Sequence, residues 1–261
     1  HTGNRRDIML GWAEQVGRYT LGALATMTDM ARLVAAVGGR GLLPASYNPA
    51  VRLVLVRQIY FTAVQILPLF LVVGLAFGSV AVGALVAGIM QLDLADQAGR
   101  LVVDLLVLEL APLFTALLVA LRSGAAIDAE MATMGLTGEF RTLSLFGVDR
   151  ATYLFLPRLL AGLISVPLLT ALFTGLVLAS AYLFLFLFAG TDVTPYLDAV
   201  IGALSAPVAA ALLAKSLLFG FLVVFIPLFS GLHPPGGLTG IPIAVLRGMM
   251  RLFLGLVLVE T

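Results

Sequence analysis

Thirty-five consecutive residues, from Gln58 to Leu92, carry no charged side chain. As an α-helix this run would extend for roughly 50 Å, well beyond the ~30 Å hydrocarbon core of a bilayer. Such a run is typical of a membrane span that is tilted, broken or partly re-entrant. Pro68 interrupts the helical hydrogen bonds, and four glycines favour close contacts between helices. We therefore expect a first span over about 62–90.

Four further apolar segments follow this run. Hydrophobic residues make up 61% of the 261 residues and charged residues only 11%, whereas soluble domains carry about 25% charge. The sequence therefore predicts an all-α membrane protein with about five transmembrane helices in one domain, residues 51–261. The expected spans are 62–90, 100–121, 155–189, 199–229 and 241–259.

The residues before the first span have a different pattern. Charged side chains recur between Ile8 and Val37, so this segment cannot cross lipid cheaply. Its apolar residues recur every three to four positions, the period of an amphipathic helix. Within residues 4–50 we expect a helix that lies on the membrane surface or packs on the bundle. Residues 1–3 have the appearance of an expression remnant.

The charged residues of the connections predict an orientation. Seven arginines precede the first span, and four more lie in or beside the 122–158 connection. The connections at 91–100 and 190–198 together hold four acids and one arginine. Because basic residues are retained on the cytoplasmic side, the N-terminus and the 122–158 connection are expected in the cytoplasm. Five spans then place the C-terminus in the periplasm.

An acidic residue lies inside the second expected span. Glu109 is roughly 12 Å deep, where an ionised carboxylate costs several kcal/mol unless it is paired or faces water. Pro112 adds a second polar group by leaving the carbonyl of Leu108 without its helical partner. The acid either lines a polar cavity, which we favour, or makes a structural hydrogen bond, with Lys215 as a candidate. Asp104 is expected to point about 140° away from Glu109 around an α-helix.

The connection after the second span has the pattern of an amphipathic helix over about 128–147. Its polar and apolar side chains recur on opposite faces, and Gly147 suits the end of such a helix. The polar face contains Glu130, Thr133, Thr137, Arg141 and Ser144, and the apolar face contains Met131, Met134, Phe140, Leu143 and Phe146. A helix of this kind between two spans needs a protein partner or the lipid surface to cover its apolar face.

The sequence contains none of several motifs that are typical of enzymes and metal sites. The chain has no nucleotide-binding G-x-x-x-x-G-K-[ST] loop, no H-E-x-x-H pair and no G-x-S-x-G elbow. It has no cysteine and two histidines, which is too few for a cysteine- or histidine-rich metal site. A net charge of +1 offers no basic surface for nucleic acid. We therefore expect no enzymatic activity, no metal and no cofactor in this chain.

A series of short motifs follows in a fixed order. It comprises Leu108-Glu109-Leu110-Ala111-Pro112, Arg122-Ser123-Gly124-Ala125, Ala129-Glu130, Val148-Asp149, Pro157-Arg158, Lys215-Ser216, Phe229-x-Gly231 and Gly240-Ile241. With Arg57-Gln58-x-Tyr60 ahead of the first span, the series resembles the MlaE-type (YrbE-like) permeases of ABC systems that work with MCE proteins. The resemblance extends over most of the chain, and the ordered set is more specific than any single motif.

The resemblance implies a homodimeric permease of the bacterial inner membrane that moves phospholipid or a related lipid and supports outer-membrane lipid asymmetry. It implies a cytoplasmic ABC ATPase that binds ATP, often a STAS-domain protein, and a periplasmic MCE protein. Glu109 would line the lipid cavity, and the insert at 130–147 would couple to the ATPase. The candidate lipid contacts are Glu109, Pro112, Leu67, Leu71, Leu75 and Leu105. The candidate ATPase contacts are Glu130, Thr133, Met134, Thr137, Glu139 and Arg141.

The sequence also departs from that family, and other classes stay open. An arginine usually precedes the acid and a glycine follows the next leucine, but here Leu108 and Ala111 stand at these positions. One alternative is a proton- or ion-coupled secondary transporter that uses Glu109, Asp104 and Lys215. Such carriers usually have two repeated halves, which we do not find. An intramembrane lipid enzyme is a third class. It would need clustered acids or a nucleophile–base pair, and this sequence has neither. Dependence on ATP separates the first class from the other two.

Overall fold

The computed structural model describes residues 28–41, 43, 47–91, 98–186, 194–232, 237 and 240–260, and within these ranges every regular element is a helix. Five helices are long and apolar enough to cross a membrane, which confirms the prediction of an all-α membrane protein with about five spans. The expected N-terminal interfacial helix is described only as helical residues 28–41, because residues 1–27 lie outside the described ranges.

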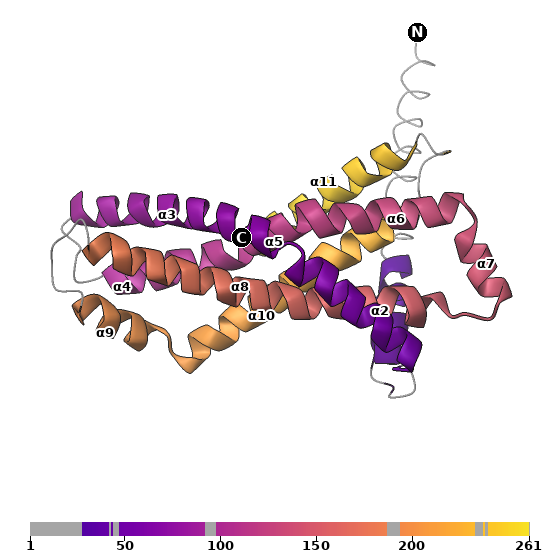
Figure 1. The fold of residues 1–261 in the computed structure, drawn as a ribbon, viewed down its shortest axis with the longest axis horizontal. Helices are drawn as coiled ribbons and strands as arrows, with labels where there is room; N and C mark the ends of the chain where they lie inside the picture. The colour runs from indigo at the N-terminus through magenta and orange to yellow at the C-terminus, as the bar shows by residue number, and fades with distance from the viewer. Residues whose placement is uncertain are drawn as a thin grey trace, which may run out of the picture.

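The five long helices run along one elongated bundle (Figure 1). The first contains α2 (Pro49–Ile59), the π-helix η2 (Tyr60–Val64) and α3 (Leu67–Gln91). The second contains α4 (Ala98–Leu101), η4 (Val102–Leu110), α5 (Ala111–Val119), η5 (Ala120–Gly124) and α6 (Ala125–Leu136). The third joins η6 (Ala151–Phe155) to α8 (Leu156–Phe184), and the last two are α10 (Ala206–Gly231) and α11 (Ile241–Glu260).

Two short helices mark the opposite ends of the bundle. Helix α7 (Glu139–Leu145) lies at the end that also carries α2 and α6, and α9 (Thr194–Ala203) lies beside α4 at the other end (Figure 1). These are called the α7 end and the α9 end below. The contacts between α4 and α9 and between α6 and α7 hold each short helix to the second long helix.

The amphipathic helix expected over 128–147 is two helices in the structure. Its first half belongs to α6, which continues the second span to Leu136, and its second half is α7. Gly138 separates them with φ +79°, a left-handed conformation that favours glycine. Gly147, with φ +70°, ends α7 through hydrogen bonds from its own amide to Ser144 and from the amide of Val148 to Leu143. The polar line read from the sequence is therefore bent at its centre.

Other boundaries also differ from the sequence-based expectations. The segment expected as one span over 199–229 is divided into α9 and α10, because Ser205 is extended (φ −77°, ψ 161°) and a proline occupies the first turn of α10. The first long helix begins at Pro49, well before the expected residue 62. The third begins at Ala151 in η6.

The second long helix contains an extended π-helical segment. In η4, hydrogen bonds connect residues five apart, as the Ala111 amide shows by donating to the Leu106 carbonyl. This segment ends just before Pro112, which has no N–H to continue the ordinary i→i−4 pattern. Because π-helical turns often occur at functional sites, η4 is a place to look for one.

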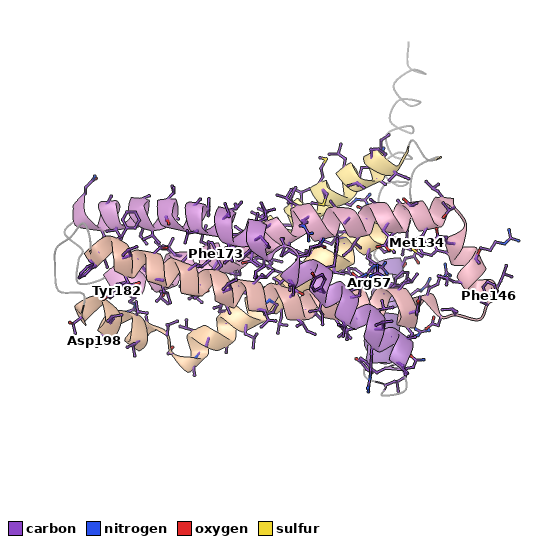
Figure 2. The ribbon with its side chains drawn as sticks, in the orientation of Figure 1. Arg57, Met134, Phe146, Phe173, Tyr182 and Asp198 are labelled. Carbon is purple, nitrogen blue, oxygen red and sulfur yellow. The ribbon has the colours of Figure 1, made fainter. Side chains whose placement is uncertain are left out.

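The core of the α9 half is aromatic. Phe114 of α5 stacks on Phe77 of α3 at 4.6 Å and on Phe173 of α8 at 4.5 Å between ring centroids. Phe70 packs edge-on against Phe173 at 6.2 Å. Figure 2 shows Phe173 between α3 and α8. A Cβ at Gly74 would lie 3.2 Å from Phe173, so this glycine makes room for the ring.

Helices α8 and α10 touch through their backbones. A Cβ built on Gly162 would lie 2.8 Å from the Gly220 carbonyl oxygen and 2.4 Å from Val224 Cγ2. A Cβ on Gly220 would lie 2.7 Å from the Gly162 carbonyl oxygen. Paired small residues allow this close approach of membrane helices. The contact positions α10, which carries Lys215, relative to the rest of the bundle.

Candidate functional site

Three charged side chains from three helices meet in an intramembrane ion cluster. Lys215 of α10 bonds to the Glu109 carboxylate of η4, and its Nζ lies 3.1 Å from Glu260 Oε1 of α11. Figure 1 shows the chain end that follows α11 about halfway along the bundle, beside α5. Charges at such depth need partners, and the cluster supplies them. The pairing of Glu109 with Lys215 is the hydrogen bond that the sequence left open as an alternative.

The cluster is closed on one side and open on the other. Lys215 and Glu260 keep 20% and 19% of their side-chain surface, whereas Glu109 keeps 53%. The exposed part of Glu109 therefore lies on the outside of this chain. With both carboxylates ionised, two negative charges face one ammonium. The cluster can accept a further cationic group, either a proton or an ammonium.

Asp104 lies on the same exposed face of η4 as Glu109, which corrects the expectation that the two acids diverge by about 140°. The expectation assumed α-helical geometry. In the π-helix, bonded residues are five apart, so residue 109 follows 104 along one face. The burial pattern agrees, because Asp104, Leu105 and Glu109 are exposed whereas Leu106 and Val107 are buried.

The predicted lipid contacts occupy different environments. Leu105 is 49% exposed on the Glu109 face of η4, and Leu75 of α3 is 52% exposed. Leu67 and Leu71 are half-buried, and Leu67 packs against the core. Pro112 is buried within the chain, where it ends the π-helical pattern. Of this set, only Leu105 is placed beside Glu109 by a shared helix face.

The predicted ATPase contacts are spread over two helices with different surroundings. On α6, Glu130 pairs with Arg158 at 2.7 Å, Thr133 donates to the Ala129 carbonyl, and Met134 is half-buried. The Thr137 hydroxyl lies 3.0 Å from Glu139 Oε1 across the bend. Glu139 and Arg141 of α7 are exposed. The exposed polar side chains of this set therefore lie on both helices, with Glu130 half-exposed on α6 and Glu139 and Arg141 exposed on α7.

Two apolar side chains at the tip of α7 were not selected from the sequence. Leu145 and Phe146 are 78% and 80% exposed. Figure 2 shows Phe146 at the far tip of the α7 end, beyond Met134. The amphipathic pattern had assigned Phe146 to an apolar face, and the structure leaves this side chain exposed. This tip is a candidate contact for a partner.

A polar network supports the α7 end where α2, α6 and α8 meet. The Arg158 guanidinium is 97% buried, with 3% of its surface exposed, and donates to the Leu154 carbonyl as well as to Glu130. Arg122 donates to the Phe61 carbonyl at 2.9 Å and lies 5.0 Å from the centre of the Phe61 ring. The π-helical turn η2 contains Phe61. These bonds tie the first, second and third long helices together.

Asp149, in the turn after α7, anchors helical residues 28–41. It pairs with Arg40 and accepts hydrogen bonds from the Thr152 hydroxyl at 2.7 Å and from the amides of Ala151 and Thr152. Burial alone would raise the pKa of Asp149, but Thr152, Arg40 and the amides outweigh it and hold the pKa below its ordinary value. The carboxylate therefore stays ionised at neutral pH and keeps Arg40 at the α7 end.

The bundle has the features of a multi-pass membrane permease: five apolar helices, charged side chains paired inside the bundle, and a two-helix projection at one end. Comparison with known proteins agrees with this class. The family model described as "Permease MlaE" matches residues 55–261. The chain therefore belongs to the MlaE family of ABC transporter permeases, as the motif series predicted.

Several relatives carry names of the same kind. A "Probable ABC transporter permease protein" of Rickettsia felis is 26% identical over 230 residues, which cover 88% of this chain and 83% of the relative. The "Probable ABC transporter permease protein ycf63" of Porphyra purpurea is 29% identical over 72% of this chain and 71% of the relative. The "Intermembrane phospholipid transport system permease protein MlaE" of Haemophilus influenzae is 36% identical over 47% of each chain.

Proposed function

We propose that this chain moves phospholipid between the inner membrane of a bacterium and a periplasmic MCE protein, with energy from ATP bound by a separate ATPase. The intramembrane ion cluster carries the proposal. A hydrocarbon environment alone gives no reason to keep Glu109 half-exposed at mid-bundle, whereas a polar head group does. The name of the Haemophilus influenzae relative, which specifies phospholipid transport, supports the same substrate.

A second copy of the chain would complete the site. The exposed side of Glu109, with Leu105 beside it, lies on the outside of one protomer. Facing copies would enclose this surface in a cavity with acids at mid-depth and apolar helix faces around them. The head group would bind at the acids and the acyl chains along the apolar faces. Closure of the ATPase would change which side of the membrane the cavity faces.

The α7 end would lie in the cytoplasm and the α9 end in the periplasm. Arginines cluster in and around the connections of the α7 end, which suits the cytoplasmic side. The exposed tip of α7, with Leu145 and Phe146, would insert into the ATPase, and Glu139 and Arg141 would flank it. A STAS-domain protein would join on the ATPase side, and the MCE protein would meet the α9 end.

The direct test is purification of the chain in detergent together with the ABC ATPase encoded nearest to its gene, followed by mass spectrometry of the bound lipid. We expect a stable complex that retains phospholipid. A chain that binds neither the ATPase nor a phospholipid would overturn the proposal and favour an ion-coupled carrier.

Reversing one charge on α7 should weaken ATPase binding. Arg141 is exposed on α7, and glutamate there would place like charges against an acidic contact or remove a favourable pair. We expect Arg141→Glu to weaken binding about tenfold, equivalent to about 1.4 kcal/mol, in a pull-down titration with the purified ATPase. Arg52→Glu is the matched control, because Arg52 is exposed on α2 at the same end of the bundle. An equal loss of ATPase binding in both variants would contradict a specific role of α7 in that binding.

One observation keeps a second candidate in view. Asp104 and Glu109 share a face of η4, and Lys215 bonds to Glu109, which is an arrangement that a proton relay could use. A carrier of this kind would work without ATP and stop when the proton gradient is collapsed. Transport in proteoliposomes that requires ATP and survives a protonophore would exclude it.

A further inference from the structure

A cavity of about 600 Å³ lies near the α9 end, between η4 and the elbow that joins α9 to α10. Pockets of roughly 300–1,000 Å³ are the usual size for small ligands. The lining residues are Arg100, Asp104, Ala199, Gly202, Ala203, Ser205 and Val208. Apart from Arg100 and Asp104, the lining residues are small or apolar. Their short side chains leave most of the cavity unfilled.

The walls of this cavity are held in place. A Cβ on Gly99 would lie 2.5 Å from the Ala199 Cβ and 3.1 Å from the Tyr196 carbonyl oxygen, so α4 and α9 are in direct contact there. The Tyr196 hydroxyl donates to the Leu178 carbonyl of α8 at 3.3 Å, and burial raises the pKa of Tyr196 to about 12, which keeps the donor protonated. The cavity is therefore part of the folded bundle.

Arg100 and Asp104, which both line this cavity, form a loose ion pair. Arg100 Nε lies 3.7 Å from Asp104 Oδ2, and the two side chains are 81% and 50% exposed. An exposed pair of this kind contributes little to stability, so both groups can turn to a ligand at small cost. A guanidinium binds phosphate oxygens with two parallel hydrogen bonds, and a carboxylate accepts from an ammonium. A phosphate diester joined to a nearby ammonium would satisfy both.

The cavity and the intramembrane ion cluster lie along the same two elements, η4 and α10. Asp104 and Glu109 follow each other on one face of η4. Val208, which lines the cavity, and Lys215, which belongs to the cluster, are seven residues apart on α10 and share one helix face. A head group could therefore move from one charged site to the other while its acyl chains stay against apolar surfaces.

We propose that this cavity is a second head-group site, selective for zwitterionic phospholipids of the ethanolamine type, in which Arg100 binds the phosphate and Asp104 binds the ammonium. The proposal rests on the phospholipid transport proposed above and extends it by naming a head-group class and a site nearer the α9 end. A protein partner docking on the same two residues is the competing explanation.

The test measures binding of short-chain phosphatidylethanolamine and phosphatidylglycerol to the purified chain in detergent. We expect Asp104→Asn to weaken phosphatidylethanolamine binding about tenfold and leave phosphatidylglycerol unchanged, because only the former has an ammonium. Arg100→Gln should weaken both lipids. Asp198→Asn is the matched control: Asp198 is exposed on α9 (Figure 2) but does not line the cavity. None of these substitutions changes a residue of the ion cluster.

Each outcome separates the possibilities. Unchanged selectivity in Asp104→Asn would overturn the second site while leaving phospholipid transport standing. Failure of the unaltered chain to bind either lipid would instead overturn the proposed function itself. Binding of soluble glycerophosphoethanolamine as tight as that of the lipid would assign the cavity to a free metabolite and overturn the lipid site. Normal lipid binding by both variants, with loss of MCE protein capture, would assign the two residues to a protein interface.

Discussion

Leucine in place of Gly162 is expected to prevent the bundle from folding. The first added carbon would lie 2.8 Å from the Gly220 carbonyl oxygen and 2.4 Å from Val224, so α8 and α10 would have to separate. Overpacking a core typically costs about 1–3 kcal/mol when side chains can shift. Here one of the obstructing atoms is backbone, and we expect a cost above about 3 kcal/mol. The measurement is thermal unfolding and monodisperse yield in detergent.

Gly175 provides the matched control, because it lies on the same helix and a Cβ there would meet no atom within 4 Å. Gly175→Leu places the same side chain in open space and should leave the melting temperature and the yield near those of the unaltered chain. If Gly162→Leu folds as well as Gly175→Leu, the backbone contact between α8 and α10 is not required. Damage in both variants would point to the loss of glycine rather than to the contact.

Lys215→Met is expected to reduce phospholipid transport more than tenfold. Lys215 is the sole cation bonded to Glu109 and Glu260 among the described residues, so its removal leaves two carboxylates facing each other inside the bundle. One or both must then take up a proton or draw in water, and the charge presented to a head group changes. Transport of fluorescent phospholipid in proteoliposomes with the ATPase and ATP is the measurement.

Three companion variants define the role of the cluster. Lys215→Arg keeps the positive charge and should retain most transport. Glu109→Leu should impair transport while ATPase binding is unchanged, because Glu109 lies far from the exposed tip of α7 along the second long helix. If Glu109→Leu transports normally, the cavity role of the acid is wrong. If Lys215→Met loses ATPase binding as well, the cluster supports the fold rather than the substrate.

The all-α fold class and the number of membrane-spanning helices could be predicted from the hydrophobic composition. The uncharged run from Gln58 to Leu92 and the later apolar segments predicted an all-α bundle with five spans, and the structure has five such helices. The motif series likewise predicted the permease family. The spans could be predicted because the free-energy cost of placing a residue in lipid depends mainly on that residue. The family could be predicted because the short motifs follow one another in a fixed order.

The bend at Gly138 and the division between α9 and α10 were not foreseen. Amphipathic spacing over 128–147 is compatible with one helix, and a glycine inside such a pattern does not reveal whether it adopts φ +79°. Contacts of α6 with α10 and α11 and of α9 with α4 accompany the bends. These contacts lie far apart in the sequence, so periodicity cannot predict them.

The sequence by itself determined that acids and a single lysine would lie within membrane spans, and it limited what they could do. Only the tertiary structure decided that Lys215 bonds to both Glu109 and Glu260, and that the π-helix η4 places Asp104 on the same face as Glu109. The physical reason is that the free-energy cost of placing a side chain in lipid depends mainly on the type of that side chain. Ion pairing and the choice between i→i+4 and i→i+5 hydrogen bonds depend instead on the neighbouring helices.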